Sequence, residues 1–351
     1  MYSNKKIKCK HFIRNYKIYY IYILTIYIIF IYKTNIFCDK TKKTFLKIVS
    51  ESYSNFNISE LKDDKERKLF TKNLTEFYIY ARTKYLMEHK VNYNESNLIT
   101  FQDKLNYLVI HESPQYKSFI VDKIRLSDYS KKILGKNICV PIIKIYDNIE
   151  DINFKDLPNK FVMKYNHGSG MNIICQDKKK FDLHKAKKKL YKWKNINYGL
   201  FTTEFQYMYV KRKIYIEKFL QKSVIDYKIY CFNGNPKFIL AKIPLKKKKL
   251  KNYYDLKWKY IKIDKHQKNL TQLHKFIKPN NLKLMLRYSK LLSQEFVFVR
   301  VDLYEINNQV FLGELTFTPM NSFKNWKDKN TSIRIGNLID IKRIKKYLFN
   351  T

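Results

Sequence analysis

The spacing of hydrophobic residues divides the chain into a helical first part and a strand-rich second part. Between residues 63 and 90, apolar positions recur at helical intervals among mixed charges, which predicts a long helix. A further amphipathic segment spans 101–108. Another spans 121–135, where Gly135 is well placed to end a helix. We therefore expect a helical region ahead of the main fold.

Beyond Pro141 the pattern changes to short runs rich in β-branched and aromatic residues. Helical patterns interrupt these runs at 182–194 and 282–295, and Asn233-Gly234 is a strong signal for a two-residue hairpin turn. Residues 63–351 contain no linker rich in Pro, Gly or Ser. We therefore expect one compact α+β unit with two lobes and antiparallel sheets. The predicted strands are 142–146, 161–164, 171–175, 214–219, 227–232, 238–243, 296–303 and 309–315.

The chain is strongly basic, with 71 Lys and Arg residues against 30 Asp and Glu and a formal net charge of +41. This balance favours anionic partners such as phosphates, acidic polysaccharides or anionic lipids. Solvated lysine-rich faces and loops are the alternative, because Lys, Asn, Ile and Tyr are all abundant. No helix-turn-helix, RNP or zinc-finger pattern accompanies the charge, so no nucleic-acid partner is expected. The five cysteines lie far apart without a CxxC pair, which argues against a zinc site.

A basic flank and a short apolar run open the chain. Six Lys or Arg residues from Lys5 to Lys17 precede residues 18–32, which carry no charge. This arrangement is typical of a signal peptide, and the run is short for a membrane-spanning helix. A retained signal-anchor, a cleaved signal and a buried helix or strand all stay open. The first two predict the secretory pathway, with a single-pass membrane-anchored protein or a luminal or secreted one.

The stretch KFVMKYNHGSGMNIIC at 160–175 combines a lysine with a glycine-containing turn between two predicted strands. Glycine lets the backbone approach a ligand closely and turn its N–H groups toward phosphate oxygens. Lys164, at the end of the first strand, would supply a positive charge to the same phosphates. The GxxxxGK[ST] spacing of a P-loop is absent. An ordinary hairpin with a glycine turn is the alternative.

Two acids, Asp302 and Glu314, lie in apolar strands around Asn307-Asn308. Burying them costs free energy unless something neutralises their charge, and a divalent cation with oxygen ligands would do so. A two-residue turn would set Asp302 against Gly313 and point Glu314 to the other face. A three-residue loop or an equivalent bulge would set Asp302 opposite Glu314, and this is what we expect. Two edge-strand acids facing water are the alternative.

Taken together, nine short segments resemble the TupA-like branch of the ATP-grasp superfamily, from about residue 101 to 348. Their order and spacing carry the resemblance. It implies an ATP-grasp-like two-lobed fold that holds ATP and Mg²⁺ between antiparallel sheets, preceded by the helical region and the N-terminal hydrophobic segment. The segments are FQDKLNYL at 101–108, VP at 140–141, YDN at 146–148, LPNKFVMK at 157–164, NHGSG at 166–170, DYK at 226–228, CFNG at 231–234, VRVDLY at 299–304 and GELTF at 313–317.

The basic and apolar N-terminus predicts a signal peptide or signal-anchor region at 1–43, and the pattern after it predicts a linker and helical segment at 44–100. The resemblance implies an ATP-grasp domain at 101–351. The lobes of that domain would span about 141–220 and 221–348. In the first lobe, Lys164 would contact phosphates beneath a closing glycine loop, and Glu217 would start a hinge whose backbone meets adenine. The residues assigned to the nucleotide are Lys164, Asn166, His167, Gly168, Ser169, Gly170, Glu217, Lys218, Phe219, Leu220 and Asp226.

In the second lobe, the resemblance implies that Asp302, Glu314 and Thr316 hold Mg²⁺. Arg300 would steady the transferred phosphate, and Lys228 would line the nucleotide or acceptor side. The chain departs from the superfamily pattern at Thr316, where Asn is usual, and after Pro319, where a glycine-containing loop is expected.

The implied activity is that of an ATP- and Mg²⁺-dependent ligase-type enzyme. It would activate a carboxylate as an acyl phosphate in order to modify an acidic glycan or peptide. The first alternative is a glycosyltransferase-like enzyme of polysaccharide biosynthesis. The second is a catalytically decayed protein that binds ATP or polyanions.

Overall fold

The structure is a computed structural model of the chain, and it describes residues 64–221, 224–244, 249–263, 276–322, 326 and 328–344. The expected signal or signal-anchor region at 1–43 and the linker before residue 64 lie outside these ranges. None of the helices described is both long and apolar enough to cross a membrane.

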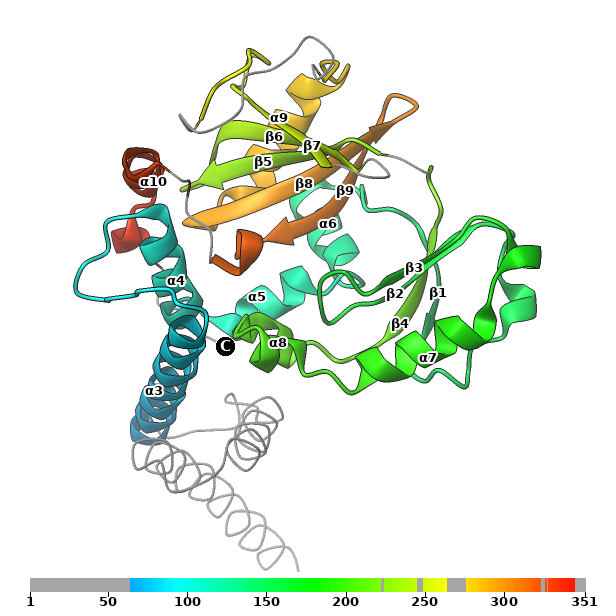
Figure 1. Cartoon of the computed structure of the whole chain (residues 1–351), viewed down its shortest axis with the longest axis horizontal. Helices are drawn as coiled ribbons and strands as arrows, with labels where there is room; N and C mark the ends of the chain where they lie inside the picture. Colours follow the sequence, from blue (N-terminus) through cyan, green and yellow to red (C-terminus); the bar gives the residue numbers. More distant parts are fainter. Residues whose placement is uncertain are drawn as a thin grey trace, which may run out of the picture.

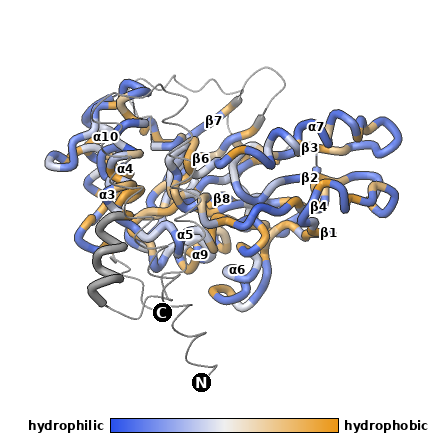
Figure 2. The backbone as a smooth tube through the Cα atoms, turned by 90° about the horizontal axis from the view of Figure 1, so that it is seen from below, coloured by the Kyte–Doolittle hydropathy of each residue, from blue (hydrophilic) through white to orange (hydrophobic). Residues whose placement is uncertain are grey.

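Four antiparallel strands form the first sheet, in the order β1-β4-β2-β3 (Figure 1). One face of this sheet is apolar, because Phe161, Met163, Ile214 and Ile216 occupy alternate positions along β2 and β4 and are fully buried. Helix α7 (Leu183–Lys194) runs beside the sheet and buries Leu190 in the same cluster, while most of its length is hydrophilic (Figure 2). The strands are β1 (Ile142–Tyr146), β2 (Phe161–Tyr165), β3 (Asn172–Cys175) and β4 (Ile214–Lys218).

Five antiparallel strands form the second sheet, in the order β7-β6-β5-β8-β9. Alternate residues such as Ile229 on β5 and Val301 on β8 face one core cluster. On the opposite face, Phe232 and Phe298 pack in a second cluster, and the same face continues toward Arg300. The strands are β5 (Asp226–Phe232), β6 (Asn235–Pro244), β7 (Lys249–Tyr254), β8 (Phe298–Ile306) and β9 (Gln309–Thr316).

Helices cover both faces of the second sheet. Helices α5, α6 and α9 contribute to the first core cluster, and α4 and α10 contribute to the second. Helix α3 contacts α4 and continues its line at the edge of this arrangement (Figure 1). The bounds are α3 (Asp64–Glu88), α4 (Phe101–His111), α5 (Pro114–Val121), α6 (Leu126–Leu134), α8 (Tyr198–Phe201), α9 (Leu282–Ser293) and α10 (Lys329–Gly336).

Local signals in the sequence explain where these helices begin and end. Thr100 and Asp103 form a capping box at the start of α4, in which the Thr100 N–H donates to the Asp103 carboxylate at 2.8 Å. Ser113 caps α5, with Pro114 in the first turn. Gly135 ends α6 in a left-handed conformation, with φ of 72°.

The single helix expected at 121–135 is wrong, since α5 ends at Val121 and α6 begins at Leu126. Asp122 lies between them, and its carboxylate accepts the Ile124 N–H at 2.9 Å. A short side chain that bonds to nearby backbone in this way competes with the helical hydrogen bonds. Strand β7 begins in a lysine run and is not among the predicted strands.

Candidate functional site

The hairpin of β8 and β9 brings two carboxylates face to face. Asn307 and Asn308 form a two-residue turn, both with left-handed backbone. The register then shifts next to Asp302, so that Gly313 is the extra residue and Asp302 pairs with Glu314. The expected pairing is therefore confirmed, and a bulge produces it in place of a three-residue loop.

Tyr304 lies between carboxylates that come from both sheets. A Cβ on Gly313 would be 2.6 Å from the Tyr304 ring, so the bulge accommodates this side chain only with glycine. Burial raises the pKa of Tyr304 well above its usual value, and the charges of Asp226, Glu314 and Glu217 raise it further. Because Glu217 belongs to β4 and Glu314 to β9, the polar faces of the two sheets lie within electrostatic range of each other.

Asp302 is neutralised by cations of the protein itself. It is 1% exposed. Arg300 donates to its two carboxylate oxygens at 2.6 and 2.7 Å, and Lys228 contacts the same carboxylate. Lys228 also lies 2.5 Å from Asp226. The burial of Asp302 is thus compensated by cations of the protein itself, and its expected role as a Mg²⁺ ligand stays a prediction.

Glu314 is the more accessible carboxylate of the pair, with 31% of its side chain exposed. Thr316 donates to it at 2.7 Å, and Arg300 approaches to 3.3 Å. Burial alone would raise its pKa, but the charges of Lys123, Arg300 and Lys228 hold the pKa down at about 2. Glu314 therefore carries a full negative charge at neutral pH.

Asp302, Glu314 and Thr316 together supply oxygen donors but no complete metal cage. In the ranges that the structure describes, no group of three or more His, Cys, Asp or Glu side chains is arranged to hold a metal ion. Mg²⁺ at nucleotide sites is usually held by one or two carboxylates, with substrate phosphates and water as the other ligands. The donors fit an ion that arrives with a nucleotide.

Lys164 and Glu217 form an ion pair between neighbouring strands β2 and β4 of the first sheet. Their side chains are 24% and 14% exposed. The ammonium of Lys164 also lies 5.9 Å from the ring centroid of Tyr215. Burial raises the pKa of Tyr215, and the charges of Glu217, Asp122 and Glu314 raise it further. Glu314 belongs to the second sheet, so this face lies within electrostatic range of that sheet.

The loop between β2 and β3 has a structural half and an exposed half. Asn166 is fully buried, donates to Asp122 at 2.9 Å and accepts the Lys213 N–H at 2.8 Å, so it fastens the loop to its neighbours. His167 is 1% exposed, and burial with the nearby charge of Arg212 lowers its pKa to about 4. Ser169 and Gly170 are exposed, and Gly170 has φ of 75°. Only the second half projects outward.

The expected hinge is the connection that leaves β4 for the second sheet (Figure 1). Lys218 is exposed, whereas Phe219 and Leu220 are half-buried. The Lys218 N–H donates to the Pro141 carbonyl at 2.9 Å, so this group is already used within the protein.

Lys123, between α5 and α6, is a site residue that the sequence analysis did not select. Its ammonium donates to the Gly168 carbonyl at 2.7 Å and lies 5.8 Å from the ring centroid of Tyr207. Burial lowers its pKa, Glu314 opposes this effect, and Lys164 adds to it. Lys123 therefore lies within electrostatic range of an acid of one sheet and the lysine of the other. Its position after Asp122 at a helix break carried no recognised signal.

Tyr198 and Glu204 connect the β2–β3 loop to the end of β9. The Tyr198 hydroxyl is hydrogen-bonded to Ser169 and to the Glu204 carboxylate. Thr318, two residues beyond β9, donates to the same carboxylate. Burial raises the pKa of Glu204. This chain of hydrogen bonds forms a wall beside the facing lysines and acids.

A sequence model of the family described as TupA-like ATP-grasp matches residues 103–340, about two thirds of the chain. The chain belongs to the TupA-like ATP-grasp family. The resemblance seen in the sequence is thereby confirmed, and the ATP-grasp protein has the antiparallel sheets that it implied. No curated protein sequence matches the chain.

Solved structures similar to this ATP-grasp protein include three ligases. D-alanine–D-alanine ligase from Helicobacter pylori is 17% identical with a TM-score of 0.36, over 63% of this chain and 61% of that one. The Bacillus anthracis enzyme is 17% identical with a TM-score of 0.38, over 75% and 82%. D-alanyl-alanine synthetase A from Vibrio cholerae is 12% identical with a TM-score of 0.39, over 71% and 73%. These likenesses are distant, and no residue role is taken from them.

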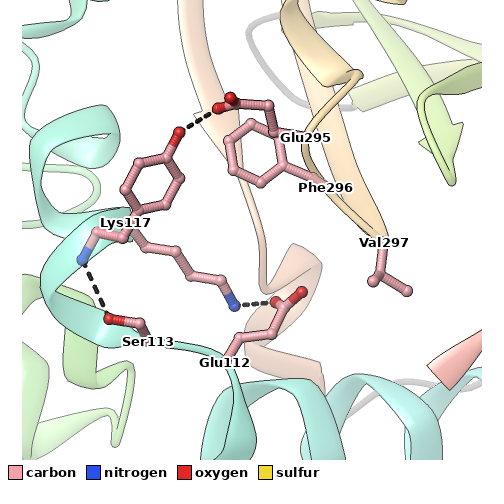
Figure 3. A pocket seen from close by; sticks show the side chains of 7 residues that line it. Glu112, Ser113, Lys117, Glu295, Phe296 and Val297 are labelled. Atoms are coloured by element: carbon pink, nitrogen blue, oxygen red, sulfur yellow. Dashed lines mark hydrogen bonds and ion pairs between the residues drawn. The ribbon is translucent and has the colours of Figure 1, made fainter. Parts of the chain in front are cut away.

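A small pocket elsewhere in the ATP-grasp protein contains none of the candidate residues. It lies between the α4–α5 junction and the start of β8 (Figure 3). Its charged and hydroxyl groups pair with one another, Lys117 with Glu112 and Tyr116 with Glu295. We therefore assign no ligand to it.

Proposed function

We propose that this protein is an ATP- and Mg²⁺-dependent ligase-type enzyme that activates a carboxylate. One observation carries the proposal: Asp302 and Glu314 share one face of the second sheet, and Lys123 lies within electrostatic range of both Glu314 and Lys164 of the first. Acids that can hold Mg²⁺ and lysines that can hold phosphate oxygens are the two halves of a nucleotide triphosphate site. Family membership supports the same assignment.

In this proposal the first sheet binds the nucleotide. Lys164 and Lys123 bind phosphate oxygens, and Ser169 and Gly170 cover them with the exposed half of the loop. Glu217 begins the hinge, and Phe219 and Leu220 contact the adenine ring. Asn166 and His167 keep the loop in place from behind, since both side chains are buried. Asp226, Gly168 and Lys218 complete the nucleotide side.

The second sheet acts on the transferred group. Asp302, Glu314 and Thr316 are the protein donors for Mg²⁺, which when bound neutralises charge on the phosphate oxygens. Arg300 and Lys228 stand beside these acids and orient the phosphoryl group that passes to a substrate carboxylate. Because the cations are held by Asp302 and Asp226, they are positioned before any ligand binds.

The acceptor in this proposal is an acidic glycan or peptide whose carboxylate is activated and then attacked by an amine. The net charge of +41 supports an anionic acceptor. We also propose that the N-terminal basic and apolar segment directs the protein to the secretory pathway, as an anchored, luminal or secreted enzyme.

Calorimetric titration of the full-length chain with ATP, with and without Mg²⁺, tests the proposal. We expect Mg²⁺-dependent binding that Lys164→Met weakens and the matched control Lys160→Met, at an exposed residue just before β2, leaves unchanged. A second titration with a nucleotide sugar tests glycosyl transfer. Binding of the sugar without binding of ATP would overturn the ligase assignment, as would binding of polyanions alone with indifference to Mg²⁺.

A further inference from the structure

Helix α3 is built into the fold although it precedes the segment that matches the family. It spans Asp64–Glu88, and the family match begins at residue 103. One side of α3 is apolar and fully buried, with Phe77 and Tyr78 packed against Phe205. In Figure 1 the helix continues the line of α4 at the side of the second sheet. It is therefore part of the folded unit.

Arg82 projects from this buried side into the protein and is 0% exposed. Its guanidinium joins three separate segments. It donates to the Asn106 side chain of α4 at 2.7 and 3.0 Å, and to the Thr203 hydroxyl after α8 at 2.7 Å. It also donates to the side chain and the backbone carbonyl of Asn321 at 2.9 and 2.8 Å. A planar guanidinium can satisfy several acceptors in this way, and a lysine cannot.

The segment held by Arg82 is strained. Met320, Asn321 and Ser322 are three consecutive residues in the left-handed region, with φ of 56°, 52° and 55°. Thr203, whose hydroxyl accepts a hydrogen bond from Arg82, has φ of 52°. Such conformations are unfavourable for residues with a side chain and persist where the surroundings fix them. The family pattern is expected to have a glycine-containing loop here. In this chain, contacts such as those with Arg82 hold a left-handed backbone that glycine would adopt without strain.

This strained loop follows directly from the candidate site. Strand β9, which carries Glu314 and Thr316, ends only three residues before Pro319. Thr318, between them, donates to Glu204, and Thr203 is the neighbour of Glu204. Arg82 thus holds the two loop segments that supply Glu204 and Thr318. These residues and Tyr198 form the hydrogen-bonded wall.

We propose that Arg82 is a positioning residue that fixes the 318–322 loop as one wall of the site. The inference rests on the proposed function for the identity of the site, and its structural part stands by itself. It makes helix α3 a component of the catalytic unit. Arg82 acts through Asn321 and Thr203 and contacts no substrate.

Methionine methyl NMR of the full-length chain tests this role. Met320 is 64% exposed in the loop, and its signal can be assigned with Met320→Leu. In Arg82→Leu we expect the Met320 signal to move or split, with the buried Met163 signal of β2 unchanged. Lys84→Leu, two residues along the same helix and 31% exposed, is the matched control and leaves both signals in place. If Arg82→Leu does not fold, Arg82→Lys provides the same comparison.

Titration with Mg²⁺ and AMPPNP, a non-hydrolysable ATP analogue, then connects the loop to the site. In the natural sequence we expect the Met320 signal to shift on saturation, and in Arg82→Leu this response is lost while the Kd stays within about threefold. A Met320 signal identical in natural and variant proteins overturns the proposal. So does an equal response to the analogue in both. If the natural protein binds no analogue, the proposed function fails, and the spectra without ligand still decide the role of Arg82.

Discussion

The two halves of the candidate site are built in different ways. On the second sheet, Asp302 is almost completely buried and held by Arg300 and Lys228 at positions fixed by strand register. On the first sheet, Lys164 and Glu217 form one partly exposed pair beneath a loop whose outer residues are exposed. The acid half on the second sheet is rigid before a ligand binds, and the lysine half on the first sheet can adapt to one. We therefore expect changes in the acid half to affect both stability and turnover, and changes in the lysine half to affect mainly affinity.

Replacing Asp302 with Asn gives the largest expected effect. The change leaves Arg300 and Lys228 buried without their counter-charge, which costs about 3–5 kcal/mol for a buried pair. ATP turnover should fall at least about a hundredfold, because a charge that acts on the transition state is lost. Chemical denaturation and ADP release measure the two effects, and Asp128→Asn at an exposed position is the control. A stable, active Asp302→Asn protein would show that this half is not prearranged.

A pH series is the next largest test, since the His167 pKa of about 4 lies below the usual 6.5. The folded state disfavours the charged ring, so this contribution to stability is complete above pH 6.5 and is lost as the pH falls toward 4. It amounts to about 3 kcal/mol at most. His167→Gln should remove this dependence. Denaturation of both proteins at pH 7 and pH 4.5 measures it, and equal losses in the two would contradict the assignment.

Lys164→Met should separate affinity from stability. The pair with Glu217 is partly exposed, so its loss should change the free energy of unfolding by less than about 1 kcal/mol. The affinity for Mg·ATP should fall about tenfold or more, because hydrogen bonds to a charged group are stronger than neutral ones. Calorimetry measures the affinity. An unchanged Kd would remove Lys164 from the phosphate site.

The smallest effect is expected at Gly170, and Gly135 offers a matched control. Both have left-handed backbone, with φ of 75° and 72°, and a Cβ on either would meet nothing within 4 Å. Alanine should therefore destabilise each protein by about 1 kcal/mol through backbone strain alone. Only Gly170→Ala should also weaken nucleotide binding, by a few-fold in Kd. Equal affinities in the two variants would indicate that the loop does not cover the phosphates.

The sequence predicted those parts of the fold whose signals are local. Runs rich in β-branched and aromatic residues identified eight strands within a few residues, and the expected pairing of Asp302 with Glu314 required a three-residue loop or an equivalent bulge. Helix α5 went unrecognised although Ser113-Pro114 is a usual helix start, so its signal was available. The domain bounds and the roles of the site residues stay predictions.

What could not be predicted depends on contacts between distant residues. Arg82 and Asn321 are 239 positions apart, and no pattern near either residue indicates the other. Lys123 resembles every other lysine in a lysine-rich chain until the fold places it within electrostatic range of Glu314. Likewise, Arg300 and Lys228 were recognised in the sequence as candidate residues. That their side chains point at Asp302 follows only from the pairing of the strands in the sheet.

The packing of helix α3 has a practical consequence for anyone who expresses this protein in pieces. A polypeptide trimmed to the family boundary at residue 103 would lack the arginine that Asn106 and Asn321 share, and would leave Phe205 without its aromatic neighbours. Such a fragment should be poorly soluble. The shortest piece worth purifying starts upstream of Asp64.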